Sequence, residues 1–193
     1  DVDLLLIDQV IENDNRVNHL EIELDEACNQ VIAKRQPTAV DLRMISTVQK
    51  TITDLERIGD EAKKIAKTAK QLHTTGSSFT PQIRLAHIAD AVVDMLRTSL
   101  DAYARLDTIS AAQVVRQDKE VDAEFKGIMR QLITYMMEDP RTISQSIELM
   151  FVAKSVERIG DHAKNIAEYV VYMVKGRDVR HTSLEEIERE ATR

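Results

Sequence analysis

Apolar residues recur every three or four positions along almost the whole chain, which is the spacing of one face of an α-helix. The last long segment shows this most clearly, with a stripe formed by Val152, Val156, Ile159, Ala163, Ile166, Val170 and Met173. Such a stripe is buried between neighbouring helices in a bundle. The pattern predicts five long helices, over residues 3–36, 38–74, 81–106, 108–138 and 141–175. Beyond residue 176, only a piece around Leu184 and Ile187 is periodic, as in a short helix or a frayed end.

The few helix-breaking residues fall between these segments. Pro37, Pro81, Pro140 and Gly176 each stand at a boundary, and a polar run at residues 74–78 separates the second segment from the third. The chain of 193 residues contains 5 glycines and 3 prolines, too few for a turn-rich β fold. The sequence therefore predicts an all-α protein.

The chain also contains an internal repeat. The block at residues 56–66, ERIGDEAKKIA, returns at residues 157–167 as ERIGDHAKNIA, with nine of eleven positions identical. Flanking positions correspond as well, so residues 108–138 repeat residues 4–36, and residues 141–175 repeat residues 40–74. The segment at 81–106 has no partner, because its equivalent would precede residue 1. We therefore predict two tandem three-helix bundles, with the first helix of the first bundle absent from this chain.

Composition and charge exclude several classes of function. The formal net charge is −7 and aromatic residues make up 4% of the chain, without tryptophan, which argues against nucleic-acid binding. Cys28 is the only cysteine, so neither an internal disulfide nor a thiolate metal site can form. No apolar run approaches the ~18 residues of a membrane span, and no signal peptide is visible. We expect a cytoplasmic protein that does not insert into a membrane.

Each copy of the repeated block carries two acids four residues apart. On a helix this spacing directs both carboxylates to one face, where they repel each other unless a cation compensates. Gly59 and Gly160 lie between the paired acids. Glycine inside a helix lowers helix stability by about 1 kcal/mol relative to alanine. We therefore expect that a metal or another backbone approaches the helix closely at these two positions. The preceding helix of each repeat adds two oxygen-bearing side chains at the same spacing. The candidate sites are Asp14, Asn18, Glu56 and Asp60 in the first repeat, and Asp118, Asp122, Glu157 and Asp161 in the second.

Four converging oxygen ligands are typical of a site for a hard cation. The alternative is a solvated helix face neutralised by Arg57, Lys63 and Lys64. Of the two metal sites, the second is expected to be the tighter, because Asn18 supplies only an amide where Asp122 supplies a charge. As exposed acids, these side chains are expected to contribute little to folding stability.

Three classes of function are weighed for such a bundle. A di-metal oxidase of the ferritin type needs glutamate followed three residues later by histidine, and no glutamate here has that partner. A histidine phosphotransfer protein needs an exposed histidine on a helical seam, and His162 is the candidate. No nucleophile–base set, glycine-rich phosphate loop or nucleotide motif is present, so we expect no enzyme activity. A metal-binding signalling adaptor is the third class.

Further motifs accompany the paired blocks: Arg35, Gln36 and Pro37, then Asp41, Leu42 and Arg43, and the run YMMEDP at residues 135–140. In this combination, from Asp3 to about His181, the chain resembles the PhoU family of bacterial phosphate-uptake regulators. The resemblance implies a first PhoU repeat at residues 1–76, without its N-terminal helix. It implies a second repeat at residues 77–193 that includes a charged tail.

The resemblance also implies a function. PhoU proteins bind metal through the duplicated acidic motif, as iron or zinc in some members, and carboxylate ligands also suit manganese and magnesium. They repress the phosphate-starvation response through the ATPase subunit of the phosphate ABC transporter and a phosphate sensor histidine kinase. The same role is implied here, for a cytoplasmic homodimer that reaches the inner membrane through these partners. Histidine phosphotransfer through His162 is the alternative.

Overall fold

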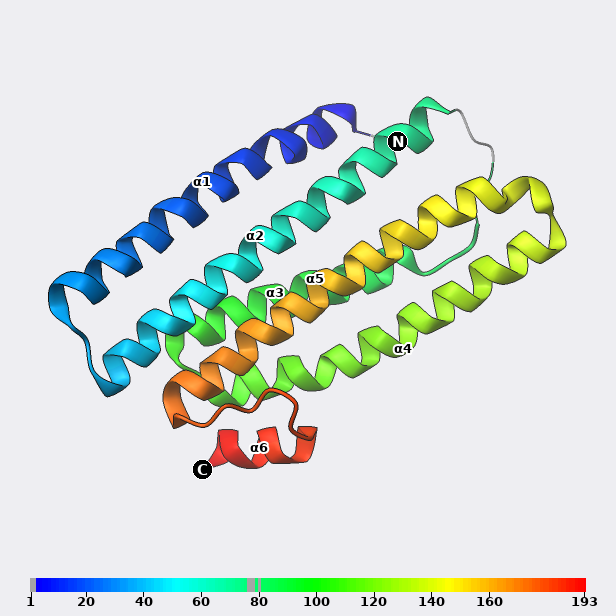
Figure 1. Cartoon of the computed structure of the whole chain (residues 1–193). Coiled ribbons are helices and arrows are strands. Elements are labelled where there is room, and N and C mark those ends of the chain that lie inside the picture. The colour runs from blue at the N-terminus through cyan, green and yellow to red at the C-terminus, as the bar shows by residue number, and fades with distance from the viewer. Residues whose placement is uncertain (1–2, 76–78, 80) are drawn as a thin grey trace.

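The computed structural model describes residues 3–75, 79 and 81–193; the predicted domain boundary between residues 76 and 77 lies outside them. Every regular element in the described residues is helical, which confirms the predicted all-α class. Figure 1 shows α1 (Leu4–Arg35), α2 (Ala39–Thr74), α3 (Leu85–Arg105), α4 (Thr108–Glu138), the 3₁₀ turn η1 (Pro140–Thr142), α5 (Ile143–Lys175) and α6 (Leu184–Thr192).

Local sequence explains where the helices begin. Asp3 and Asp107, which correspond in the repeat, accept hydrogen bonds from backbone amides in the first turns of α1 and α4. α3 begins at Leu85 and not at Pro81 as predicted, because the residues between them form a turn closed by a hydrogen bond to the Pro81 carbonyl oxygen. The periodic piece of the tail is the short helix α6, capped by Ser183.

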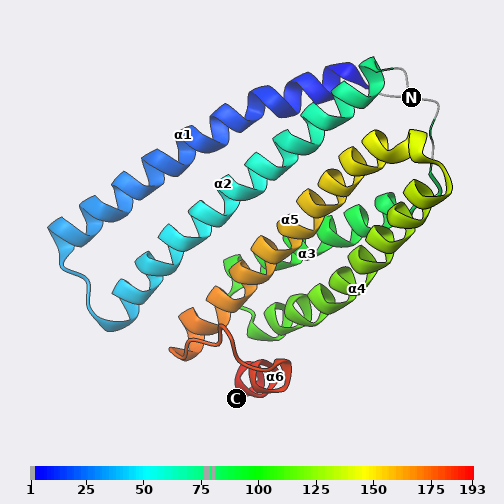
Figure 2. The same cartoon turned by 45° about the vertical axis from the view of Figure 1, so that its right-hand side comes forward.

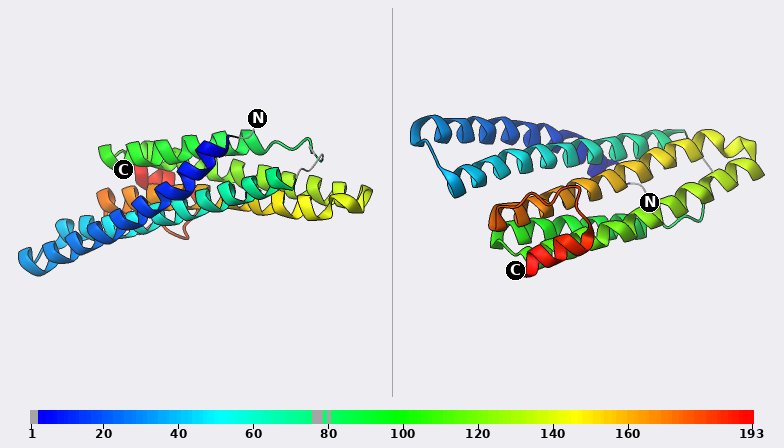
Figure 3. Two further views of the ribbon diagram at one scale, coloured as in Figure 1. Left: turned by 90° about the horizontal axis from the view of Figure 1, so that it is seen from above. Right: turned by 60° about the horizontal axis from the view of Figure 1, so that its bottom comes forward.

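The helices form two groups that meet along α2 and α5. Figures 1 and 2 show α1 on the outer side of α2, and α3 and α4 packed beside α5. α2 and α5 are antiparallel: Thr47 of α2 contacts Met173 near the end of α5, whereas Gln71 contacts Glu148 near its start. α6 packs against α4, as Figure 3 shows from below. The contact between α2 and α5 therefore joins the two copies of the repeat.

The two groups differ in how fully they are covered. The helices α3 to α6 enclose the main hydrophobic core, with fully buried side chains that include Ile88, Met95, Leu132, Val170 and Ile187. α1, in contrast, packs only against α2, and no third described helix contacts both α1 and α2. α3 does cover the equivalent faces of α4 and α5. This is the arrangement expected of a duplicated three-helix unit whose first helix is absent from the chain.

Arg43 links the start of α2 to the end of α5. Its Nε donates a hydrogen bond of 3.2 Å to the carbonyl oxygen of Met173, in the last turn of α5, where carbonyls lack intrahelical partners. Its guanidinium lies 6.0 Å from the ring centre of Tyr172. α5 ends at Gly176, whose φ of 74° is left-handed. The left-handed backbone favours glycine, and a Cβ on Gly176 would also displace the flexible end of the Arg43 side chain.

We predict that Gly176→Ala lowers the free energy of unfolding by about 1–3 kcal/mol, because it adds left-handed strain to the displacement of Arg43. Gly127→Ala in α4 is the matched control, since no heavy atom lies within 4 Å of the added Cβ. Gly127→Ala should raise the free energy of unfolding by up to about 1 kcal/mol. Urea unfolding followed by circular dichroism measures both, and equal effects of the two substitutions would contradict the capping role.

Candidate metal centres

The first acidic cluster lies between α1 and α2 and is centred on Asp14. The side chain of Asp14 is almost fully buried, and its Oδ2 accepts a hydrogen bond of 2.6 Å from Lys63 Nζ. Asn18 Nδ2 lies 3.5 Å from the same oxygen. The second oxygen of Asp14, Oδ1, is buried without a hydrogen-bond partner, and so is Oδ1 of Asn18. Two buried acceptors without donors are uncommon in proteins, and a bound cation would satisfy both.

Gly59 brings α2 close to these acceptors. A Cβ on Gly59 would lie 3.5 Å from Asp14 Oδ1 and 3.5 Å from a methyl group of Val17. The glycine between Glu56 and Asp60 therefore faces α1, as the sequence predicted for a position that another group must approach. Glu56 and Asp60 therefore lie on either side of the point where Gly59 of α2 meets Asp14 of α1.

Glu21 is a member of this cluster that the sequence did not identify. The pKa of Glu56 is raised, first by burial and then by the negative charges of Asp60 and Glu21, with a further contribution from Asp14. Glu21 follows Asp14 by seven residues and so lies on the same face of α1. Its counterpart in the second repeat is Phe125, so a search for acids repeated in both copies overlooks it. The spacing of seven residues from Asp14 is the feature of the sequence that could have identified Glu21.

The second acidic cluster lies between α4 and α5 and is more fully neutralised. Lys164 Nζ donates a hydrogen bond of 2.8 Å to Asp118 Oδ2, and Lys154 Nζ lies 2.5 Å from Glu157 Oε2. Burial, followed by the charges of Glu157 and Asp118, raises the pKa of Asp161. These three acids therefore lie close together. Asp122 is half-buried on α4, one turn after Asp118.

The expectation that these acids are exposed is wrong for three of them. Asp14, Asp118 and Glu157 are buried, because the acidic faces are turned toward the neighbouring helix and lysines neutralise them there. Within the described residues, no three acidic, histidine or cysteine side chains are arranged as a ready-made metal site. A cation would thus have to displace lysine ammonium groups. The eight ligand positions remain a prediction.

The two clusters differ in the charged side chains that surround them. The first cluster has four carboxylates, from Asp14, Glu21, Glu56 and Asp60, with Lys63 paired to them. The second also has four, from Asp118, Asp122, Glu157 and Asp161, but Lys154 and Lys164 are both paired there. Glu21 thus adds a carboxylate to the cluster that contains Asn18, and the order of affinity expected from the sequence, with the second site tighter, stays a prediction.

His162 does not have the exposure that phosphotransfer requires. Its side chain is 12% exposed between α2 and α5, and Nδ1 lies 2.6 Å from Oδ1 of the buried Asp54. Asn165 donates a second hydrogen bond, of 3.1 Å, to the same oxygen of Asp54. His162 thus joins the two repeats, and the expectation of an exposed histidine on a seam is wrong.

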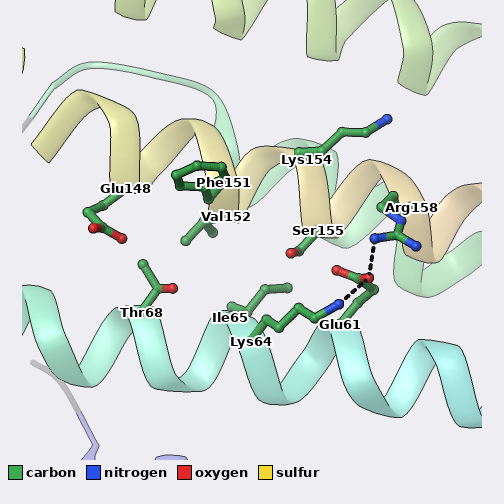
Figure 4. A pocket seen from close by; sticks show the side chains of 10 residues that line it. All are labelled: Glu61, Lys64, Ile65, Thr68, Glu148, Phe151, Val152, Lys154, Ser155 and Arg158. Atoms are coloured by element: carbon green, nitrogen blue, oxygen red, sulfur yellow. Dashed lines mark hydrogen bonds and ion pairs between the residues drawn. The ribbon is translucent and has the colours of Figure 1, made fainter. Parts of the chain in front are cut away.

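A polar contact of the same kind surrounds Glu61, two helical turns further along α2. Figure 4 shows its carboxylate pointing at Lys64 and Arg158, with Nζ and Nη1 at 2.9 and 2.8 Å. These donors, together with Ser155, hold the pKa of this buried carboxyl below its usual range. The pocket above it, about 300 Å³, is lined on its apolar side by Ile65, Phe151 and Val152. Three basic and two acidic side chains line this pocket, so its charge does not favour a metal cation.

A duplicated helical bundle with an acidic cluster in each copy defines the class of protein: an all-α tandem-repeat protein with paired candidate cation sites. None of its helices in the described part combines the length and apolar character needed to cross a bilayer. Comparisons with known proteins identify the class further. Residues 1–69 and 85–170 match the family model of the PhoU domain, and the chain belongs to the PhoU family.

The relatives named PhoU are similar over nearly the whole chain. The phosphate-specific transport system accessory protein PhoU homolog of Pseudomonas aeruginosa is 47% identical over 190 residues, which cover 98% of this chain and 78% of the relative. The protein named PhoU in Escherichia coli K12 is 48% identical over 185 residues, covering 95% and 76%. The crystal structure of PhoU from P. aeruginosa matches with a TM-score of 0.88, at 47% identity, over 91% of this chain and 84% of that one.

We predict that two substitutions in the second cluster change stability in opposite directions. Because the folded-state pKa of Asp161 is raised, its charged form costs stability at neutral pH, and that cost disappears as the pH falls through this pKa. Asp161→Asn should therefore raise the free energy of unfolding at pH 7 by roughly 0.2–0.5 kcal/mol, and the gain should fade in acid. Asp118→Asn should lower it by roughly 1–3 kcal/mol, because Lys164 loses its buried partner.

Urea titrations at pH 7 and pH 4 measure both effects in the metal-free protein. A loss of stability on Asp161→Asn at pH 7 would show that this carboxylate is a structural acceptor and not an uncompensated charge.

Proposed function

We propose that this protein is a non-enzymatic, metal-binding regulatory adaptor of bacterial phosphate signalling. Membership of the PhoU family supports a role in phosphate transport, since the relatives are named phosphate-specific transport system accessory proteins. The observation that carries metal binding is the buried, unpartnered Oδ1 of Asp14, set among the carboxylates of Glu21, Glu56 and Asp60.

The residues of the first cluster suit a hard or borderline cation. Asp14 Oδ1 and Asn18 Oδ1 are available as ligands without breaking any hydrogen bond, and the mutual repulsion of Glu56 and Asp60 would be relieved by a positive charge. Lys63 would have to move away from Asp14, so the ammonium group and the cation compete. Manganese, magnesium, iron and zinc all accept such ligands. The bound ion supplies positive charge between α1 and α2, and no bond-breaking step is assigned to it.

In the proposed role, the protein represses the phosphate-starvation response when phosphate is plentiful. It does so by binding the ATPase subunit of the phosphate ABC transporter and the phosphate sensor histidine kinase, as a homodimer at the cytoplasmic face of the inner membrane. Occupancy of the acidic clusters changes the charge at the α1–α2 and α4–α5 contacts, which gives the adaptor a metal-dependent state. Phosphotransfer is not proposed, because Asp54 and the surrounding helices enclose His162.

We predict that the metal-free protein binds Mn²⁺ near neutral pH through the first cluster. Glu21→Gln should weaken this binding roughly tenfold, because it removes one anionic ligand. Glu23→Gln is the matched control, since Glu23 is exposed on the same helix two residues away, and its effect should stay within about twofold. Isothermal titration calorimetry measures both.

Two further titrations complete this test. Asn18→Asp should tighten binding by adding a charge, and lowering the pH should weaken it earlier than for ordinary carboxylates, because the pKa of Glu56 is raised. Absence of Mn²⁺, Fe²⁺, Zn²⁺ and Mg²⁺ binding by the folded protein would refute the metal site. Equal effects of Glu21→Gln and Glu23→Gln would refute the assignment of Glu21.

The regulatory role predicts a phenotype in cells that lack the endogenous copy. A phosphate-repressible reporter should remain active at high phosphate in such cells, and the wild-type protein should silence it. The double variant Glu56→Gln, Asp60→Asn should fail to silence it, whereas Glu23→Gln should succeed. Pull-downs with the tagged protein should recover the transporter ATPase subunit and the sensor kinase. Recovery of neither partner by folded protein, or a reporter unaffected by the wild type, would refute the proposal.

A further inference from the structure

Two clefts lie along the contact between α2 and α5. One is the pocket beside Glu61 that Figure 4 shows, which we call the Glu61 cleft. The other, the Arg57 cleft, has a volume of about 410 Å³, and its lining includes Asp25, Lys50, Thr53, Asp54, Arg57 and Tyr169.

The two clefts occupy equivalent places in the two copies of the repeat. Lys50, Thr53, Asp54 and Arg57 correspond to Phe151, Lys154, Ser155 and Arg158, and Tyr169 corresponds to Thr68. All five counterparts line the Glu61 cleft. A comparison of the two clefts therefore shows what each one has that the other lacks.

In the Glu61 cleft, a carboxylate from the opposite helix neutralises the arginine. Nη1 of Arg158 on α5 lies 2.8 Å from Oε1 of Glu61 on α2, and Glu61 is buried. The counterpart of Glu61 in the Arg57 cleft is His162, which pairs with Asp54. The Arg57 cleft therefore contains the equivalent arginine without the carboxylate that would neutralise it.

Two cations of the Arg57 cleft have no acidic partner. Among the described residues, neither Arg57 nor Lys50 forms an ion pair with a carboxylate. Lys50 Nζ lies 5.6 Å from the ring centres of both Tyr169 and Tyr172, which attract its charge without neutralising it. Lys50 and Arg57 are seven residues apart on α2 and so lie on the same face of the helix. One anion bound between their long side chains would neutralise both charges.

The acids of the Arg57 cleft are held by other groups. Asp54 is buried and paired with His162. Asp25 accepts one hydrogen bond on each oxygen, from Gln49 at 2.9 Å and from Asn29 at 3.1 Å. These amides leave the negative charge of Asp25 in place, so Asp25 repels an anion in the cleft. An anion that carries a hydroxyl group offsets this repulsion, because it donates a hydrogen bond to the carboxylate, which can only accept.

We propose that the Arg57 cleft binds inorganic phosphate. Arg57 and Lys50 donate hydrogen bonds to the phosphate oxygens, and Asp25 accepts one from the phosphate hydroxyl. The anion takes the place that the Glu61 carboxylate has in the other half of the molecule. Sulfate has the same shape but no hydroxyl at neutral pH, so Asp25 disfavours it.

The position of this site follows from the unpaired cations and does not depend on the acidic clusters. The choice of phosphate among hydroxyl-bearing oxyanions rests on the proposed function. A bound phosphate would contact α2 and the helices packed on either side of it, α1 and α5, since all three line the cleft. It should therefore also raise the temperature of unfolding, because it binds the folded chain.

Isothermal titration calorimetry on the metal-free chain of 193 residues, at neutral pH and low salt, tests the assignment. The wild-type protein should bind one phosphate ion with a Kd of about 1 mM or less. Arg57→Gln should weaken this binding about tenfold or more, because it removes a charged donor. Lys67→Gln is the matched control, since Lys67 is an exposed cation of the same helix that does not line the cleft. Its effect should stay within about twofold.

Sulfate tests the role of Asp25. The wild-type protein should bind sulfate about fivefold or more weakly than phosphate, because sulfate cannot donate to the carboxylate. Asp25→Asn removes the repulsion and should bring the two affinities to within about twofold. A wild-type protein that binds sulfate as tightly as phosphate would refute this role.

A double variant transfers the arrangement of the Glu61 cleft into the Arg57 cleft. Asp54→Ser combined with His162→Glu gives both positions the side chains of their counterparts, Ser155 and Glu61. The introduced carboxylate should pair with Arg57 and abolish phosphate binding, while the circular dichroism spectrum stays that of the wild type. If this variant does not fold, the comparison of Arg57→Gln with Lys67→Gln decides.

Three results would overturn the proposal: no phosphate binding by the folded wild-type protein, equal losses on Arg57→Gln and Lys67→Gln, or binding retained by the folded double variant. The proposed function is judged separately. A protein that silences the phosphate-repressible reporter without binding phosphate would keep that function and refute this site. A protein that binds phosphate through Arg57 but leaves the reporter active would do the reverse.

Discussion

The antiparallel contact between α2 and α5 is the constraint on which the rest of the structure depends, because it is where the two copies of the repeat meet. Both helices carry the repeated block, and each turns one face to its own repeat and another to the opposite repeat. The paired acids four residues apart in each block lie toward α1 or α4, whereas Arg158 reaches across to Glu61 and His162 reaches across to Asp54. Each block therefore serves a candidate site and the joint between repeats at once.

This joint is symmetric in position and asymmetric in chemistry. The repeat relates Asp54 to Ser155 and Glu61 to His162, so the pair Asp54 and His162 occupies the place of Ser155 and Glu61 in the other half. Two buried carboxylates, two helical turns apart on α2, have different donors: a histidine and an amide for Asp54, a lysine and an arginine for Glu61. A shift of α2 along α5 would separate both carboxylates from their donors on α5, so the joint favours a single register.

The fold was largely readable from the sequence, and the candidate sites only in part. Long apolar periodicity and sparse breakers determine the helices, and the duplication predicts an uncovered hairpin. A search for acids present in both copies of the repeat misses a site residue that only one copy has. Glu21 has Phe125 as its counterpart, so comparison of the two copies hides an acid that adds to the first cluster. The burial of Asp14 and Asp118 was not predicted for another reason. An acid on a helix is usually exposed unless a cation on a neighbouring helix pairs with it. Such a pair depends on how the two helices pack, which the sequence pattern does not show.

Lys63 and Lys164 show why a cation at these clusters would act as a signal more than as a structural support. The two lysines occupy equivalent positions in the two copies of the repeated block. Each neutralises a buried aspartate of the preceding helix, with Nζ–Oδ2 distances of 2.6 Å for Lys63 and Asp14 and 2.8 Å for Lys164 and Asp118. Each of these buried aspartates therefore has a positive partner supplied by the protein itself. A cation that displaces the ammonium group exchanges one positive partner for another of higher charge and releases a long, flexible side chain. Such an exchange would alter the charge at the contact between the helices, and in the proposed role this alteration is what a partner protein would recognise.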